Sequence, residues 1–291
     1  MSITAVVEVL IDNAIFTESP RWYEGAFWFS DIGKGTVNRV GPNGRSEVIV
    51  SDIPAPSGLG WTKSGDLLVA SLATSTIYKV GGDGKPVALA GPEQHGSAAT
   101  NDMATAGSRS YISCAGHVFQ MGDDEATLAK PVGAVLLLDH DSGVCRKVAG
   151  ELKMPNGIAI TPDGKTLVLA ELYACRILHF DILDDGSLSA PRVFAQLDHI
   201  ADGISLDAEG GLWIGTGLDR CQRIDSTGKP AGIVIVPGWS CVAPMLGGPD
   251  GQTLYIAANL MEKPDDIFTG KAKGRIVTAR VDIPAAPTSQ R

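Results

Sequence analysis

The chain has 291 residues, of which 44% are hydrophobic and 20% charged, and these proportions exclude a disordered or fibrous protein. Acidic residues outnumber basic ones by 33 to 24, which gives a net charge of −9, and no basic run could follow a phosphate backbone. We therefore expect no nucleic-acid partner.

The N-terminal segment and the cysteines indicate the compartment. Residues 1–16 lack a basic start and a small-residue cleavage site, and no apolar stretch approaches the roughly 20 residues that cross a bilayer. We expect a cytoplasmic protein without a membrane partner. No cysteine belongs to a short paired zinc or redox motif, so we expect reduced structural thiols at Cys114, Cys145, Cys175, Cys221 and Cys241.

After a short apolar segment at residues 5–10, one unit recurs along the rest of the chain. It combines a polar residue, usually beside Gly or Ser, with an alternating strand, a Gly-containing turn and a second apolar strand. The units begin at or near Glu18, Ser57, Asn101, Asn156, Asp202 and Leu246. Their spacings of 39, 44, 55, 46 and 44 residues are typical of propeller blades.

This repeat predicts an all-β protein, a six-bladed β-propeller. One blade cannot bury both of its faces, so the ring must close on itself and we expect a single domain over residues 1–291. Residues 5–10 have no blade of their own and are predicted to pair beside residues 274–279 in the last blade. The irregular stretch at residues 117–130 is predicted to be a surface loop or a lid.

The first strand of every propeller blade lines the central channel, so the starting residues of the units should converge. Glu18, Asn101, Asn156 and Asp202 would then offer hard oxygen ligands, which suit one divalent cation such as Ca²⁺, Mg²⁺ or Mn²⁺, with Zn²⁺ and Fe²⁺ also open. A cation would also compensate two neighbouring carboxylates. The alternative is that Asx-Gly and Ser-Gly steps only form turns, which leaves Glu18 unexplained.

Several short stretches, read together and in order, point to one family. They lie at residues 18–22, 28–32, 101–102, 155–158, 202–204, 247–250 and 253–255. With them the sequence, over nearly its whole length, resembles the family of senescence marker protein, gluconolactonase and luciferin-regenerating enzyme, which includes regucalcin. The resemblance implies a six-bladed propeller whose metal is held by Glu18, Asn156 and Asp202, with Asn101 close by as a substrate contact.

The resemblance also implies the chemistry of a lactonase. In family members the cation polarises a lactone carbonyl and helps to activate water, and the residue matching Asp202 is the candidate general base. The same roles follow physically, because a Lewis acid stabilises a developing oxyanion and a neighbouring carboxylate can accept the proton of an attacking water. The predicted substrate is a small lactone or ester.

One position departs from the family pattern and concerns the substrate. Family members that act on sugar lactones typically carry Arg where this chain has Ala99, so a less polar lactone or another ester is an equal candidate. His117 lies just past a predicted strand, where a loop over the channel mouth would begin, and is a candidate substrate contact. Further candidates for the wall of the mouth are Trp22, Trp28, Phe119 and Met245.

Three other functions stay open at this point. The same metal site could serve a phosphotriester hydrolase, because an oxygen-ligated cation can polarise P=O as well as C=O. A non-catalytic metal-binding propeller is an alternative from another class, since fold does not fix function. A synthase of the strictosidine type usually lacks the metal ligands, so Glu18, Asn156 and Asp202 argue against it.

Overall fold

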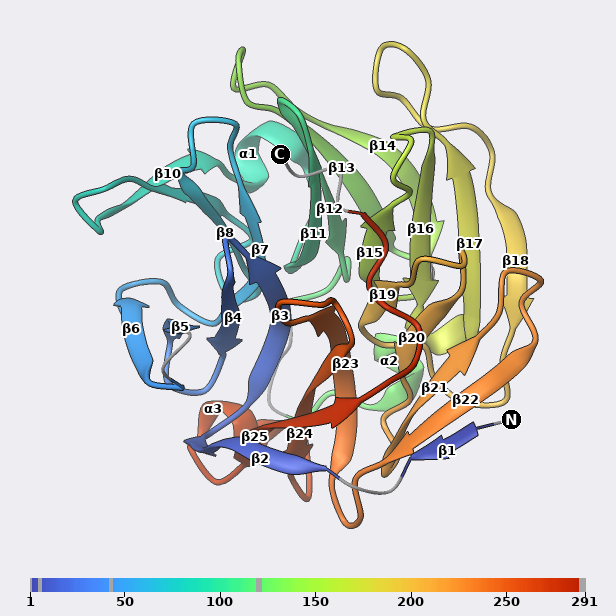
Figure 1. The fold of residues 1–291 in the computed structure, drawn as a ribbon. Helices are drawn as coiled ribbons and strands as arrows, with labels where there is room; N and C mark the ends of the chain where they lie inside the picture. The colour runs from blue at the N-terminus through green and yellow to red at the C-terminus, as the bar shows by residue number, and fades with distance from the viewer. Residues whose placement is uncertain (1, 5–6, 42–43, 119–121, 288–291) are drawn as a thin grey trace.

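A computed structural model gives the fold, and it describes residues 2–4, 7–41, 44–118 and 122–287. The described residues form six sheets that stand around a common axis (Figure 1). This arrangement confirms the predicted all-β, six-bladed β-propeller. No helix in these ranges is both long and apolar enough to span a membrane.

The first three blades are built in chain order from the axis outward. Blade one contains β3 (Thr17–Tyr23), β4 (Ala26–Asp31), β5 (Thr36–Val40) and β6 (Ser46–Val50). Blade two contains β7 (Pro56–Trp61), β8 (Leu67–Ser71), β9 (Ile77–Val80) and β10 (Pro86–Ala90). Blade three contains β11 (Thr100–Ala106), β12 (Arg109–Cys114), β13 (Gly133–Asp139) and β14 (Cys145–Leu152).

The last three blades follow the same plan, and two of them take up N-terminal strands. Blade four contains β15 (Pro155–Ile160), β16 (Thr166–Glu171), β17 (Arg176–Asp181) and β18 (Arg192–Gln196). Blade five contains β19 (Ile204–Leu206), β20 (Leu212–Gly215), β21 (Arg220–Ile224), β22 (Pro230–Ile235) and β1 (Ser2–Thr4). Blade six contains β23 (Ser240–Gly247), β24 (Thr253–Leu260), β25 (Lys273–Arg280) and β2 (Glu8–Ala14).

The N-terminal segment joins two blades. Strand β2 pairs antiparallel with β25, with Glu8 opposite Thr278, while Ala5 and Val6 of the expected strand lie outside the described residues. Strand β1 pairs parallel with β22 in blade five, which the sequence pattern did not indicate. The sixth sheet therefore contains both an N-terminal and a C-terminal strand of the propeller.

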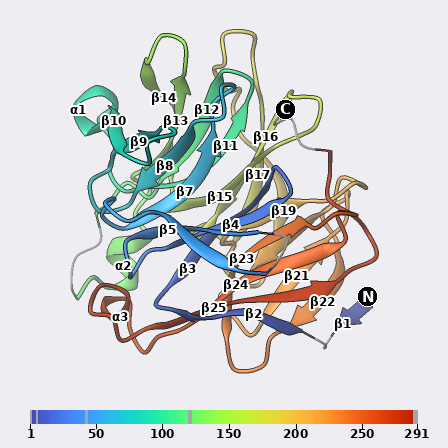
Figure 2. The same cartoon turned by 60° about the vertical axis from the view of Figure 1, so that its left-hand side comes forward.

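Short helices distinguish the two faces of the ring. Helices α2 (Glu125–Leu128) and α3 (Asp265–Phe268) lie on one face, and the C-terminal segment crosses the opposite one (Figure 2). We call these the helix face and the tail face. Helix α1 (Pro92–His95) and the 3-10 helix η1 (Leu172–Ala174) lie in loops. The expected loop at residues 117–130 contains α2, and residues 119–121 lie outside the described part.

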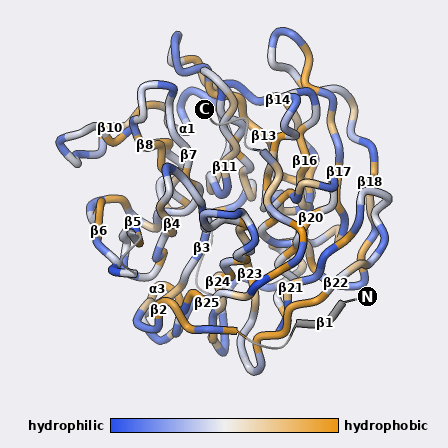
Figure 3. Tube along the Cα trace, viewed as in Figure 1, coloured by the Kyte–Doolittle hydropathy of each residue, from blue (hydrophilic) through white to orange (hydrophobic). Residues whose placement is uncertain are grey.

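Apolar side chains fill the space between neighbouring blades. One such cluster joins Leu68 and Ile77 of blade two to Met103, Ile112 and Leu136 of blade three, all with no exposed surface. Figure 3 shows hydrophobic residues along the strands, whereas many hairpin loops at the rim are hydrophilic. The blades are thus held together mainly by burial of apolar surface between sheets.

The glycines beside the predicted site residues let the innermost strands approach one another. Gly58, Gly157 and Gly203 do not have a positive φ, and the first two lie inside β7 and β15. A Cβ on Gly157 would lie 2.6 Å from the carbonyl oxygen of Asp202 in the next blade. The interpretation of these Gly steps as turns is therefore wrong, since each glycine meets the backbone of the following blade.

We expect Gly157→Ala to lower the free energy of unfolding by about 1–3 kcal/mol, because the added methyl overpacks a backbone contact between blades. Gly82→Ala is the matched control, since a Cβ there has nothing within 4 Å. Denaturant unfolding of both variants measures the difference. Equal stability of the two would show that the close approach at Gly157 is not needed.

Candidate functional site

Three of the four polar residues predicted to converge interact across blades, because the charge of Glu18 acts on Asp202 and the Asn156 side chain donates a hydrogen bond to Asp202. Glu18 lies on β3, Asn101 on β11, Asn156 on β15, and Asp202 two residues before β19, so each comes from a different blade. All four are buried, with 7–9% of each residue exposed. These strands lie in contact around the ring, β3 with β23, β11 with β15 and β15 with β19. We call these four residues the axial cluster.

The two carboxyl groups of the axial cluster interact electrostatically. Burial raises the pKa of Glu18 to about 7, against the opposing effect of the Ser19 N–H, which donates to Glu18 Oε2 at 2.6 Å. Burial, followed by the charges of Glu18 and Asp102, raises the pKa of Asp202 well above its ordinary value. Two ionised carboxylates therefore repel each other here in the absence of a positive charge.

The Asp202 carboxyl is only partly satisfied. A hydrogen bond from the Asn156 side chain lowers its pKa, as does one from the Gly203 N–H. Its Oδ1 atom, however, is buried and has no hydrogen-bond partner among the described residues. A buried charged oxygen without a partner is costly, and a cation is one way to satisfy it.

The oxygen atoms present fit a hard divalent cation. Glu18 and Asp202 provide two carboxylates, and the amide of Asn156 provides a carbonyl oxygen, a set that suits Ca²⁺, Mg²⁺ or Mn²⁺. Within the described ranges no group of three or more His, Cys, Asp or Glu residues is arranged to hold a metal. Any cation at this site therefore depends on an amide ligand as well as on acidic side chains.

Asn101 is oriented by the neighbouring blade. Ser57 on β7 has no exposed surface, and its hydroxyl donates to Asn101 Oδ1 at 3.0 Å. With that oxygen engaged, the amide NH₂ group is the part of Asn101 that can donate to a bound molecule. This orientation favours a substrate contact over metal ligation for Asn101.

A β-bulge interrupts each of four inner strands at the predicted position. Pairing with the second strand breaks after Glu18 in β3, after Pro56 in β7, after Thr100 in β11 and after Pro155 in β15. A bulge adds a residue to one strand and redirects its side chains, and bulges are frequent beside active sites. The repeated bulge explains how side chains of inner strands can turn towards the axis at this level.

The sequence interpretation missed a buried ion pair next to the axial cluster. Arg21 on β3 was given no role, yet its guanidinium forms an ion pair with Asp102 and donates to the carbonyl oxygens of Leu59 at 3.2 Å and Met103 at 2.7 Å. Asp102 also accepts the N–H of Ile158 at 3.3 Å. Through these contacts the ion pair connects blades one to four. In the sequence, the one indication of this pair was the carboxylate of Asp102 directly after Asn101.

The polar contact of His117 is with its own loop and not with the axial cluster. It follows β12, and its Nε2 lies 2.9 Å from Asp123 Oδ2 within the same loop. The imidazole of His117 therefore pairs with a carboxylate of the same loop. Its role in substrate binding remains a prediction. Phe119 lies outside the described residues.

Three candidate wall residues lie away from the axial cluster. Trp22 and Met245 line a small cavity of about 120 Å³ together with residues 285–287 of the C-terminal segment. Trp28 packs edge-on against Trp61 at 5.4 Å and belongs to the contact between blades one and two. Alternation along a strand predicts which side chains share a face, but not which end of the channel they meet.

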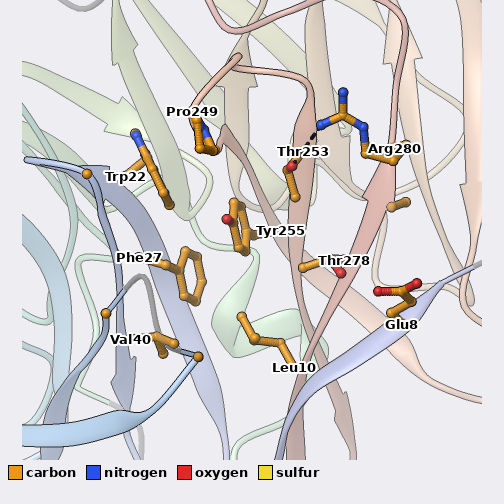
Figure 4. A pocket seen from close by; sticks show the side chains of 15 residues that line it. Glu8, Leu10, Trp22, Phe27, Val40, Pro249, Thr253, Tyr255, Thr278 and Arg280 are labelled. Carbon is orange, nitrogen blue, oxygen red and sulfur yellow. Dashed lines mark hydrogen bonds between the residues drawn. The ribbon is translucent and has the colours of Figure 1, made fainter.

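A large cavity lies away from the axial cluster. It measures about 840 Å³ and lies between blades one and six, where Trp22, Phe27 and Tyr255 stack with centroids 4.4 and 5.7 Å apart (Figure 4). Its lining includes Arg280 and Glu8 and none of the axial cluster. We therefore locate the candidate site by its convergent polar groups and not by the volume of a cavity.

Fold and site together define a β-propeller with an axial group of carboxylate and amide side chains, and comparison with known proteins supplies the family. The sequence profile of the SMP-30/Gluconolactonase/LRE-like region matches residues 16–259. The chain therefore belongs to the SMP-30/gluconolactonase/LRE-like family, as the sequence motifs predicted.

Individual relatives and structures are more distant. The L-arabinolactonase of Azospirillum brasilense is 27% identical over 210 residues, which cover 70% of this chain and 67% of that protein. The chain spans between about a third and two thirds of the length of four curated relatives. A luciferin-regenerating enzyme is similar with a TM-score of 0.80 at 16% identity, covering 98% of both chains. A calcium-binding regucalcin from Agrobacterium tumefaciens has a TM-score of 0.76 at 20% identity, covering 99% of both.

We expect Arg21→Met to lower the free energy of unfolding by about 3–5 kcal/mol, because it leaves Asp102 buried without its partner. Arg280→Met is the control, since Arg280 forms an exposed pair with Asp250 at 2.7 Å and should change stability little. Denaturant unfolding with the cation removed measures both. Similar losses in the two variants would mean that the buried pair does not stabilise the channel.

Proposed function

We propose that this protein is a divalent-metal-dependent lactonase. The observation that carries the proposal is the unpartnered Asp202 Oδ1, buried beside a second carboxylate on the propeller axis. Support also comes from relatives described as L-arabinolactonase and as lactonase, and from the calcium-binding regucalcin with the same fold. The proposed substrate is a small lactone and the proposed cofactor one divalent cation.

Each residue of the axial cluster receives a role. Glu18, Asn156 and Asp202 would hold the cation, which supplies a Lewis acid for the lactone carbonyl. Asp202 would take the proton of the attacking water on a carboxylate oxygen, and the amide NH₂ of Asn101 would donate to the substrate. The Ser57 hydroxyl keeps Asn101 in that orientation. Arg21 and Asp102 hold the inner strands that carry these groups.

The proposal is tested by acid release from a panel of lactones at constant pH. Metal-stripped protein is assayed alone and with each of Ca²⁺, Mg²⁺, Mn²⁺ and Zn²⁺. Hydrolysis restored by a cation supports the proposal. Hydrolysis without any added cation would show that the function does not depend on a metal. If no lactone is hydrolysed, the lactonase function is overturned, and a phosphotriester hydrolase or a non-catalytic metal-binding propeller is tested next.

We expect Asp202→Asn to reduce kcat by at least about 10²-fold, because it removes the proposed base together with one ligand charge. The fold should persist, since no blade depends on that charge. Asp198→Asn is the matched control four residues away, with 94% of its side chain exposed, and should keep full activity. Full turnover by Asp202→Asn in the presence of cation would show that another group is the base.

We expect Glu18→Gln to weaken cation binding, which can be measured without any assay of activity. A ligand that binds the native state raises the melting temperature, so the cation-induced rise should shrink in this variant. Without cation, the variant should be at least as stable as the wild type, because one of two repelling carboxylates is gone. Glu93→Gln, at an exposed position in α1, should behave like the wild type in both respects. An unchanged rise for Glu18→Gln would exclude Glu18 as a ligand.

A further inference from the structure

A second layer of residues surrounds the axis on the helix-face side of the axial cluster. Two positions before the site residue, the inner segments of blades one to four carry Phe16, Ala55, Ala99 and Met154. Ala55, Ala99 and Met154 share a left-handed backbone conformation, with φ of 45°, 53° and 55°, so the inner segments of blades two to four turn in the same way at this level. Its members are apolar, in contrast to the polar cluster one step deeper.

The same hydrogen bond recurs at this layer in four blades. The carbonyl oxygens of these residues accept the N–H of the residue that follows the second strand, at 2.9–3.1 Å. In blade order the donors are Ile32, Leu72, Ala115 and Leu172. The donors are apolar too, so each blade contributes a pair of apolar side chains at the same height.

These eight residues belong to one hydrophobic cluster, each with 8% or less of its surface exposed. Ile200 of blade five packs against the cluster, and Val242 and Ala243 of blade six are part of it. Ile267 of α3 packs against the cluster on the helix-face side, and Trp22 and Tyr255 pack against it elsewhere, so the cluster extends from under the helix face to the contact between blades one and six. All six blades contribute to the cluster, and the eight residues joined by the repeated hydrogen bond form the part of it that is next in sequence to the axial cluster.

Nearby acidic groups are already occupied. Asp31 has 1% of its surface exposed and accepts the N–H groups of Ile15 and Phe16 at 3.1 Å. Glu171, also 1% exposed, accepts the Lys153 N–H at 2.6 Å and the Arg176 Nε–H at 2.5 Å. These carboxylates hold the loops that lead into β3 and β15. Both carboxylates already accept hydrogen bonds from the protein, so we do not expect them to bind a ligand in the channel.

From this layer, and resting on the lactonase function proposed above, we infer the class of substrate. We propose that the site takes a lactone whose ring carries an alkyl or aryl substituent, and that this apolar layer selects it over polyhydroxylated lactones. The carbonyl reaches the axial cluster while the substituent packs among Phe16, Leu72, Met154 and Leu172. Substrate hydroxyl groups placed in this layer would lose their hydrogen bonds to water and gain none from its apolar side chains. Each additional buried methylene of the substituent, in contrast, raises kcat/KM by about ten-fold or more.

The wild-type protein provides the first test, because two lactones with the same ring can be compared. The probes are δ-nonalactone and D-glucono-δ-lactone, assayed with the most active cation and normalised to their uncatalysed rates. We expect kcat/KM for the alkyl lactone to be at least about ten-fold higher. Equal or higher values for the sugar lactone overturn the inference and leave the lactonase standing. If the protein hydrolyses neither probe and no lactone of the earlier panel, the proposed lactonase function itself is overturned.

A variant tests the layer directly. Leu72→Gln places an amide in it, and we expect the ratio of kcat/KM between the alkyl and the sugar lactone to fall at least about five-fold. The ratio is independent of how much protein is folded, so a loss of stability does not obscure the result. Leu183→Gln is the matched control, at a 48% exposed position in a hairpin of blade four, and should leave the ratio unchanged. An unchanged ratio in Leu72→Gln would show that this layer does not contact the substituent.

Discussion

The close approach of the innermost strands is the constraint on which the rest of the structure depends. Gly58, Gly157 and Gly203 bring the backbone of one blade against the backbone of the next, leaving no space for a Cβ. This approach brings the innermost strands of neighbouring blades close together. Bulges at the same level then redirect their side chains, so that packing and chemistry have a common geometric origin.

The axis is organised in layers with different physical properties. An apolar layer lies towards the helix face, the axial cluster follows, and the ion pair of Arg21 with Asp102 lies beside it. Apolar surroundings strengthen electrostatic interactions, which makes the unpartnered Asp202 oxygen costly in isolation and effective when a positive charge is near. The same surroundings restrict which molecules can approach the polar groups.

The sequence predicted the repeat, the number of blades, the family and the proximity of Glu18, Asn156 and Asp202, because period-two alternation and Gly-containing turns are local signals. It did not predict the Arg21–Asp102 pair or the end of the channel that Trp22 and Met245 meet. The ion pair and the positions of these two side chains depend on bulges and on packing between blades, and neither produces a periodic pattern in the sequence. Turn formation, the alternative role left open for these glycines, is wrong because they face the backbone of another blade, which a sequence does not show.

The pairing of β2 with β25 also governs the order in which the molecule can be made. Residues 8–14 are synthesised before the strands from β3 to β24, but their partner strand at residues 273–280 is synthesised after all of these. A contact of such long sequence separation has a large loop-closure entropy and forms slowly. During translation β2 therefore has no partner strand until β25 has been synthesised, and the ring can close only after that point.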